Sequence, residues 1–391
     1  MADLRSIVHM DLDTFFVSCE RLVNPKFNGL PLIIGGSTDR GVVASCSYEA
    51  RTFGVRSAMP MKMALRLCPQ AKVVKGDMEL YSKQSHTVTE IIKTAAPVVE
   101  KASIDEFYLD ITGMDKFFGC YKWTGELIDK IEKETGLPMS YALSVNKTVA
   151  KIGTGEAKPH GKIEISSQMV KPFLNPLSIR KIPMVGDKTF ELLSRINVRK
   201  IQTLAEMPVP YLQSLIGANG LTLWKKANGI DENPVEPYSE RKSISTDETF
   251  AQDTIDITQV KSIFVSMAEK LAYQLRQEGW ITSTVTVKIR YSSFDTHTKQ
   301  SKIAYTSCDH VLITKVNELF DKLYERRMRI RLVGINFSGL IRGAYQINLF
   351  EDTADHISLY QAIDKMKNRF GYEAIQRCAG LELKKDKRKR K

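Results

Sequence analysis

The chain has 391 residues, 43% of them hydrophobic, as in an ordinary globular protein of two to four domains. Its 57 Lys and Arg residues outnumber its 45 Asp and Glu residues, and the net charge of +12 favours a polyanionic partner. On charge alone, an anionic membrane surface or a basic solubility tail stays open as an alternative. The six scattered cysteines argue against a zinc site or a disulfide framework. No apolar run approaches membrane-spanning length. A cytoplasmic protein without a membrane partner is therefore expected.

Segments that alternate between strand-like and helix-like patterns fill the first 165 residues. Strands are predicted at residues 5–11, 31–35, 41–46 and 139–145, helices at 13–22, 48–53, 60–67, 79–95, 121–135 and from 148 onward, and an acidic hairpin at 98–110. Asp13 stands where a helix N-cap belongs, just before Thr14, so a capping role is favoured for it. Because residues two apart share a strand face, joint metal ligation by Asp11 and Asp13 stays open.

Residues 166–233 change to short helices interrupted by Pro and Gly. Residues 182–193 look like a helix-hairpin-helix unit, whose hairpin N–H groups bind a DNA phosphate, although Met184 stands where such units more often carry Gly. Residues 217–220 are a candidate second hairpin, and an ordinary helix-turn-helix packing element is the alternative interpretation. Residues 234–242 are predicted to form a linker.

The segment after the linker predicts a small split α/β sandwich. Strands are expected at 243–250, 281–291, 300–307 and 330–340 and helices at 257–277 and 309–325, in the order βαββαβ. The tail from Gly343 contains an amphipathic run that ends at Gly371, with Leu359, Ile363, Met366 and Phe370 on one face, and a basic end from Lys384.

Three carboxylates are the candidate metal ligands. Asp11 ends the first predicted strand, and Asp105 and Glu106 lie at the turn of the acidic hairpin. Carboxylates on neighbouring strand ends can hold two divalent cations about 3.5–4 Å apart, an arrangement that promotes in-line phosphoryl displacement. Mg²⁺ suits such a site because it prefers oxygen ligands and shares them with substrate phosphates. Taken alone, an Asp-Glu pair is more often a solvated turn.

Four motifs in order support the metal interpretation. They are residues 9–16, residues 47–55, residues 103–106, and Asn146-Lys147 with residues 157–159. The series resembles the Y-family (translesion) DNA polymerases, most closely the bacterial DNA polymerase IV type, over about residues 5 to 342. The resemblance implies an α/β multidomain, right-hand polymerase: a palm at 1–11 and 78–165, small fingers at 12–77, a helix-hairpin-helix thumb at 166–233, and a βαββαβ little finger at 243–342, followed by the tail at 343–391.

The resemblance also implies the reaction. Asp11, Asp105, Glu106 and the backbone carbonyl of Leu12 would bind two Mg²⁺ ions for template-directed transfer of dNTPs to a primer 3′-hydroxyl. Translesion synthesis of low fidelity without proofreading is expected, by a monomer acting on primer-template DNA. One alternative is a catalytically silent polymerase-like scaffold that binds DNA and a sliding clamp, but such relatives typically lose the carboxylates kept here. A nucleotide cyclase is disfavoured by the helix-hairpin-helix region, the βαββαβ segment and the basic charge.

Substrate roles follow from the same resemblance. Tyr48 and Arg51 lie three apart, hence on one helix face, and with Lys158 they would grip the triphosphate. Phe16 would be the steric gate that leaves no room for a 2′-hydroxyl, and Phe15 would pack in the core. Without the motif, the first three would be surface residues and both phenylalanines core residues.

A candidate clamp-binding motif follows the last predicted strand. Residues 346–350 read Gln-Ile-Asn-Leu-Phe, and Gln-x-x-Leu-Phe resembles the peptide by which bacterial polymerases dock on the sliding clamp. Gln346 would orient the peptide, while Leu349 and Phe350 would fill an apolar pocket of the clamp. The alternative is that Leu349 and Phe350 pack on the chain's own tail helix.

Overall fold

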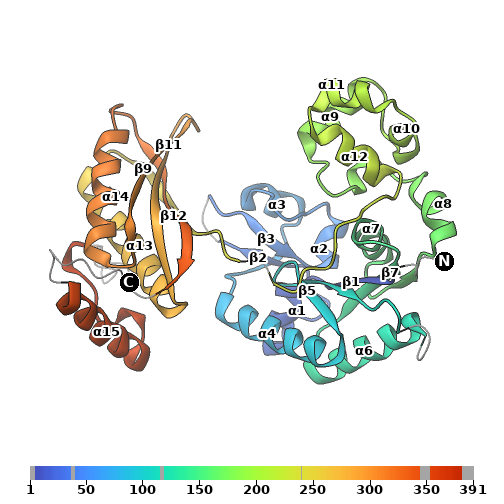
Figure 1. Ribbon diagram of the computed structural model, residues 1–391, viewed down its shortest axis with the longest axis horizontal. Coiled ribbons are helices and arrows are strands. Elements are labelled where there is room, and N and C mark those ends of the chain that lie inside the picture. Colours follow the sequence, from blue (N-terminus) through green and yellow to red (C-terminus); the bar gives the residue numbers. More distant parts are fainter. Residues whose placement is uncertain (1–4, 37–39, 115–118, 239, 344–352, 381–391) are drawn as a thin grey trace. The chain divides into compact units, whose positions relative to one another are not determined.

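The computed structural model describes residues 5–36, 40–114, 119–238, 240–343 and 353–380 (Figure 1). The chain divides into two compact units, Met1–Ser239 and Glu240–Lys391. Among the described helices, none combines the length and the apolar character needed to cross a bilayer.

A five-stranded sheet organises the first unit, with β1 at its centre. Its order is β5 (Val98–Lys101), β6 (Glu106–Asp110), β1 (Ile7–Leu12), β7 (Met139–Ser144) and β8 (Lys162–Glu164), and β1 runs antiparallel to both neighbours. Val8, Met10 and Leu12 of β1 pack into a core with α1 (Phe15–Val23), α4 (Met78–Ala95) and α6 (Cys120–Thr135). The alternate residues of β1 face α7 (Lys147–Ala157), so helices cover both faces of the sheet.

A smaller sheet carries the segment between α1 and α4. Its order is β3 (Val43–Cys46), β2 (Leu32–Gly35) and β4 (Lys72–Val74), beside η1 (Pro25–Phe27), α2 (Tyr48–Thr52) and α3 (Met61–Leu67). Ser47 caps the five-residue helix α2, because its side chain accepts a hydrogen bond from the Ala50 N–H group. The cap therefore fixes the start of α2 and, with it, the directions in which the Tyr48 and Arg51 side chains extend.

Short helices complete the first unit and share a hydrophobic core with α7. They are η2 (Ser167–Met169), α8 (Val170–Leu174), η3 (Ile179–Lys181), α9 (Asp187–Arg195), α10 (Ile201–Ala205), α11 (Val209–Ile216) and α12 (Asn219–Ala227). Met184, in the hairpin before α9, has φ 88°, a left-handed conformation that glycine adopts without strain. The backbone there has the conformation for which the motif more often uses Gly, although the residue is Met.

The second unit has the expected βαββαβ order. Its elements are β9 (Ser243–Thr254), α13 (Ile257–Gln277), β10 (Trp280–Tyr291), β11 (Thr296–Thr306), α14 (Asp309–Leu323) and β12 (Ile330–Arg342). The strands form an antiparallel sheet in the order β11-β10-β12-β9. Alternate residues of β10, such as Val285, Val287 and Ile289, pack with both helices in one core.

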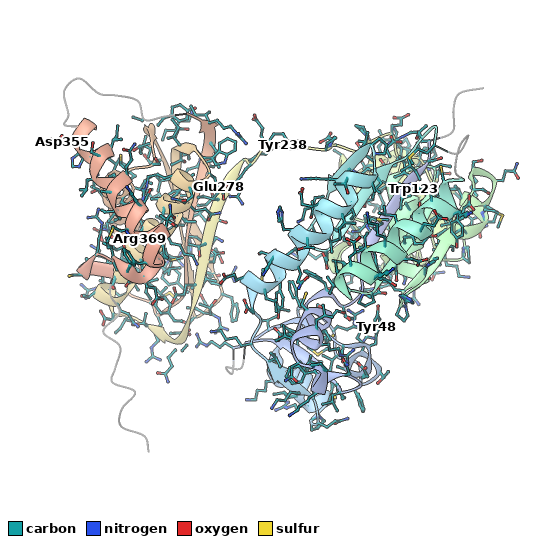
Figure 2. The ribbon with its side chains drawn as sticks, turned by 90° about the horizontal axis from the view of Figure 1, so that it is seen from below. Tyr48, Trp123, Tyr238, Glu278, Asp355 and Arg369 are labelled. Carbon is teal, nitrogen blue, oxygen red and sulfur yellow. The ribbon has the colours of Figure 1, made fainter. Side chains whose placement is uncertain are left out.

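The tail helix α15 (Thr353–Phe370), followed by η4 (Tyr372–Ala374) and η5 (Cys378–Gly380), buries its polar face. Asp355 and Arg369 mark its two ends in Figure 2. Arg276 of α13 donates to Asp364 at 2.7 and 2.9 Å and to Asp309 at 2.5 Å, and these side chains are nearly inaccessible to solvent. Much of the predicted apolar run is exposed: Leu359 by 52%, Met366 by 43% and Phe370 by 58%. An ion-paired network, in place of the apolar stripe, holds this helix.

Candidate active site

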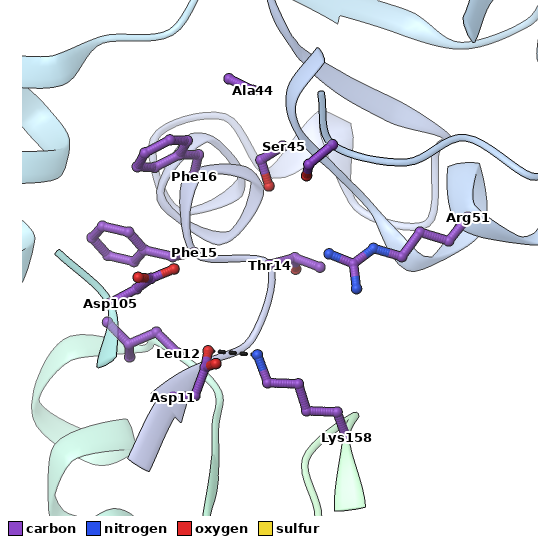
Figure 3. Close-up of a pocket in the computed structure, with 11 residues that line it drawn as sticks. Asp11, Leu12, Thr14, Phe15, Phe16, Ala44, Ser45, Arg51, Asp105 and Lys158 are labelled. Atoms are coloured by element: carbon purple, nitrogen blue, oxygen red, sulfur yellow. Dashed lines mark hydrogen bonds and ion pairs between the residues drawn. The ribbon is translucent and has the colours of Figure 1, made fainter. Parts of the chain in front are cut away.

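A cavity of about 150 Å³ lies where β1 ends (Figure 3). It is lined by Asp11 and Leu12 of β1, Thr14, Phe15 and Phe16 at the start of α1, Ala44 and Ser45 of β3, Arg51 of α2, and Ser57, Asp105 and Lys158. Six of the sequence-predicted site residues are in that set. Glu106 and Tyr48 lie next to the cavity: Glu106 pairs with Asp11 in the β1–β6 register, and the Tyr48 ring lies against Arg51.

Strand pairing brings the three predicted carboxylates together. Asp11 stands directly opposite Glu106 in the β1–β6 register, and the Leu12 N–H group donates to the Asp105 carbonyl at 3.0 Å. Ser103 shapes the turn: its hydroxyl donates to Asp105 Oδ1 at 2.5 Å and accepts from the Asp105 and Glu106 N–H groups. The hairpin thus delivers Asp105 and Glu106 to the end of β1.

Two lysines from the α7 region neutralise this cluster. Lys158 Nζ lies 2.5 Å from Asp11 Oδ1, and Lys151 Nζ lies 2.7 and 2.6 Å from the two carboxylate oxygens of Glu106. Lys151 was not predicted from the sequence. Among the described residues, no group of three or more His, Cys, Asp or Glu side chains is arranged to hold a metal ion, and Asp11 and Glu106 are each paired with a lysine.

The electrostatics of Asp11 fit a cation-binding role. Burial raises the pKa of Asp11 from 3.8 to about 7; the Lys158 ammonium opposes this rise, and the Asp105 and Glu106 charges add to it. A positive charge nearby strongly stabilises the ionised form of a carboxylate that is buried in this way. The donor set of clustered carboxylate oxygens is the kind that Mg²⁺ prefers.

His9 supports the strand behind the cluster. Its Nδ1 lies 3.0 Å from the Thr154 hydroxyl, which also donates to the His9 carbonyl at 3.0 Å. Burial, with Lys151 and Lys158 nearby, holds the pKa of His9 well below its usual value, so the ring stays neutral. The pair ties β1 to α7, the helix that carries Lys151 and is followed directly by Lys158.

Arg51 lines the cavity, and Tyr48 lies beside Arg51. The Arg51 side chain extends from α2 into the cavity, as Figure 3 shows, and its guanidinium lies 5.0 Å from the centre of the Tyr48 ring. Burial, with the Asp13 carboxylate, raises the pKa of Tyr48, so the phenol keeps its proton as a hydrogen-bond donor. Arg51 and Lys158 together offer an anion several N–H donors, and the single O–H group of Tyr48 donates to Asp13.

The predicted capping role of Asp13 is wrong. Helix α1 begins at Phe15, its N-cap residue is Thr14 with φ 44°, and no side chain caps it. Asp13 is 2% exposed, and its N–H group donates to the Pro138 carbonyl. Because β1 pairing runs through Leu12, the chain is still held against its neighbours at Asp13, and the carboxylate turns inward instead of toward α1.

The two phenylalanines of α1 lie in different environments. Phe15 is buried in the core, as predicted. Phe16 is half-buried, lines the cavity, and stacks on Tyr81 of α4 with ring centres 4.4 Å apart and planes 13° apart. Tyr81 is held in turn by a 2.6 Å hydrogen bond to Glu20. Tyr81 was missed by sequence reasoning, although its place on the buried face of an amphipathic helix gave a signal.

The proposed clamp residues Gln346, Leu349 and Phe350 lie outside the described residues, as does the basic end from Lys384. The clamp-binding role of these residues therefore stays a prediction.

Comparisons with known proteins agree over nearly the whole chain. Residues 10–155 match the impB/mucB/samB family, and residues 241–349 match its C-terminal domain. DNA polymerase IV of Dehalococcoides mccartyi is 34% identical over 97% of this chain and 99% of its own length. DNA polymerase IV of Treponema denticola is 36% identical over 86% and 85%, and that of Streptococcus pneumoniae 37% identical over 86% and 97%.

Solved structures show the same likeness. A Y-family DNA polymerase chimera, Dbh-Dpo4(243-245)-Dbh, superposes with a TM-score of 0.75 at 26% identity, covering 86% of this chain and all of its own. An insertion ternary complex of Dbh DNA polymerase gives a TM-score of 0.64 at 25% identity with the same coverage. The multidomain α/β fold is therefore the one these proteins share.

Proposed function

The chain belongs to the Y-family DNA polymerases, and from that membership we propose that the cavity at the end of β1 is its site of nucleotidyl transfer. It is a DNA-directed DNA polymerase of the translesion type, similar to DNA polymerase IV. The silent-scaffold and cyclase alternatives therefore fall away. The low fidelity and lack of proofreading expected from the sequence remain part of the proposal.

One observation carries the site: the register that sets Asp11 opposite Glu106, with Asp105 at the adjoining turn and a lysine on Asp11 and on Glu106. Membership of this family implies metal-dependent catalysis, and we assign the binding of two Mg²⁺ ions to these carboxylates and the Leu12 carbonyl. When bound, such ions neutralise charge and lower the pKa of an attacking hydroxyl. The residues' own contribution is to gather oxygen ligands at one strand end, on a buried rigid sheet.

The triphosphate is assigned to the cationic side of the cavity. Arg51 extends into it from α2, and Lys158 reaches it from the segment after α7, where its partner is Asp11. A planar guanidinium suits two phosphate oxygens at once, and Tyr48 contributes the ring that packs against Arg51, while its one hydroxyl proton is donated to Asp13. These groups bind and orient the dNTP so that the α-phosphate faces the primer hydroxyl.

The sugar is assigned to Phe16. Its ring lines the cavity and rests flat on the buried ring of Tyr81, so it has little room to move away from a ligand. A 2′-hydroxyl placed against it would meet packed aromatic carbon. Discrimination between ribose and deoxyribose follows from this contact.

We assign the larger parts by their content. The five-stranded sheet is the palm (residues 1–11 and 78–165), the smaller sheet the fingers (12–77), and the short helices the thumb (166–233), with a linker at 234–242. The unit with the βαββαβ order is the little finger (243–342), which fits the match to the family's C-terminal domain. Primer-template DNA is the partner that the positive net charge favours, and a monomer is assigned. Residues 346–350 are assigned to a sliding clamp.

Primer extension with Mg²⁺ tests the site. Asp105→Ala removes one carboxylate of the set, and extension should fall to near zero while duplex affinity is unchanged, since phosphate contacts carry DNA binding. Asp129→Ala, which removes a 67% exposed carboxylate, is the matched control and should extend normally. Extension by Asp105→Ala within about tenfold of the unchanged protein would overturn the assignment.

A further inference from the structure

Asp13 is a buried carboxylate next to the cavity that joins three distant segments. Its Oδ1 accepts from the Tyr48 hydroxyl at 3.1 Å, and its Oδ2 accepts from the Ser140 hydroxyl at 2.8 Å and from the His160 N–H group at 2.6 Å. These donors belong to α2, to β7 and to the turn after α7. One side chain thus ties together elements up to 147 residues apart.

Burying such a group is unfavourable unless its charge is compensated. Asp13 is 2% exposed, and beyond its hydrogen bonds the nearest counter-charge is Lys158, whose Nζ lies 3.8 Å from Oδ1. Lys158 is closer to Asp11, at 2.5 Å. A neutral side chain would fill this position at less electrostatic cost, which argues that the connection itself is what the carboxylate provides.

The connected segments carry Lys158 and the Tyr48 ring on which Arg51 packs, so they place both cationic triphosphate donors. Tyr48 begins α2, and Lys158 comes two residues before the His160 N–H group that Asp13 binds. Arg51 stacks on the Tyr48 ring, so a fixed Tyr48 also restricts the approach of Arg51. The Ser140 hydroxyl that donates to Asp13 also accepts from the Gly161 N–H group at 3.1 Å, which further holds the turn.

We propose that Asp13 is a positioning residue for dNTP binding, which holds Tyr48 and the Lys158 turn at fixed places beside the cavity. This rests on the proposed function, because it takes Arg51 and Lys158 as triphosphate ligands. Asp13 does not line the cavity itself, so it acts through these residues.

The kinetic signature follows from that indirect role. Donors that are free to move bind the triphosphate more weakly in the ground state and the transition state alike, which raises KM and leaves kcat nearly unchanged. Asp13→Ala removes the acceptors for all three donors, and the KM for dNTP should rise by about 10- to 100-fold. In Asp13→Asn, the amide oxygen can still accept from Ser140 and His160, and the amide nitrogen can donate to the Tyr48 oxygen. This variant should stay within about threefold of the unchanged protein.

Steady-state insertion of a single nucleotide, with kcat and KM measured separately, tests the proposal. Asp231→Ala is the matched control: Asp231 is a half-buried carboxylate that accepts from the Thr148 hydroxyl at 2.6 Å and the Asn233 amide at 2.7 Å, away from the cavity lining. It should lower the melting temperature without changing the KM. If Asp13→Ala fails to fold, Ser140→Ala removes one donor alone and should raise the KM about threefold.

Three results would overturn the proposal: an unchanged KM in the folded Asp13→Ala or Ser140→Ala variant, a fall in kcat at constant KM, or an Asn variant as defective as the Ala variant. The last two would mean that Asp13 acts on the reacting atoms or through its charge. Arg51→Ala and Lys158→Ala separate this from a failure of the proposed function, because neither variant removes a hydrogen-bond donor to Asp13. If neither raises the KM, the triphosphate assignment fails; if both do and Asp13→Ala does not, only the positioning role fails.

Discussion

Asp11→Asn should stabilise the metal-free protein at neutral and alkaline pH while abolishing primer extension. Burial raises the pKa of Asp11 from 3.8 to about 7, so the folded chain prefers this group protonated. Well below pH 3.8 the folded and unfolded states both carry the proton, and the shift leaves stability unaffected there. As the pH rises toward 7, the unfolded state loses its proton first, and the stability of the folded state falls. Asn mimics the protonated form at every pH.

The magnitude follows from the size of the shift. A rise from 3.8 to about 7 is about three pKa units, and each unit is worth about 1.4 kcal/mol. The side chain of Asp11 is 13% exposed, so solvent screening reduces this little. We therefore expect Asp11→Asn to raise the free energy of unfolding by about 2–4 kcal/mol at pH 8 and by less than about 1 kcal/mol at pH 4.

Urea unfolding at pH 4 to 8 with a chelator measures this difference. Trp123 and Trp224 report on the first unit, and replacing Trp280 with Phe removes the signal of the second unit. Mg²⁺ at about 100 times its dissociation constant should stabilise the unchanged protein by about 2.7 kcal/mol and leave the Asn variant unaffected. A pH-independent difference, or an Asn variant less stable at pH 8, would refute the reasoning.

Three further predictions concern substrate and partners. Phe16→Ala should raise insertion of ribonucleotides relative to deoxyribonucleotides, measured with matched rNTP and dNTP; an unchanged ratio would return Phe16 to a packing role. Duplex affinity, measured by anisotropy titration, should fall log-linearly and steeply with salt and show little sequence preference, and a shallow slope would argue against phosphate contacts. Leu349→Ala combined with Phe350→Ala should leave synthesis on a bare primer-template intact and remove stimulation by a loaded clamp; stimulation that survives would place the docking site elsewhere.

Local patterns in the sequence were enough to predict most elements. The helix predicted at 257–277 has those bounds in the structure, and the strand predicted at 281–291 begins one residue earlier, because periodicity and polar caps are local signals. The strand predicted at 300–307 instead begins at Thr296. The reason is a tight hairpin turn in which Phe294 adopts φ 70°, a left-handed conformation that a phenylalanine in the sequence does not predict.

The site was predictable only as far as its motifs reached. Asp11, Asp105, Arg51 and Lys158 do line one cavity. The ion pair of Lys151 with Glu106 depends on how α7 packs over β1 and β7, and the stacking of Tyr81 on Phe16 depends on how α4 packs beside α1. Such contacts join residues 45 or more positions apart, so no local spacing encodes them.

The error over Asp13 shows why a local rule failed at this position. An Asp before an aromatic, helix-forming run has the sequence of an N-cap, and the rule holds where the side chain has no stronger partner. Here three donors, from Tyr48, Ser140 and His160, converge on the carboxylate. Tertiary hydrogen bonds outweigh one capping bond to a helix N–H group, and α1 begins without a side-chain cap.

The lysines explain how a chain can fold with so much negative charge at one strand end. Asp11 and Glu106 face each other across β1 and β6, and each is met by a lysine from the same helix or the turn that follows it. Lys158 cannot hold Asp11 and grip a phosphate at full strength at once. If Lys158 binds the triphosphate as proposed, a cation that replaces Lys158 beside Asp11 frees the lysine ammonium for the phosphates. The two binding events then favour each other through one side chain, and by linkage the coupling is equal in both directions.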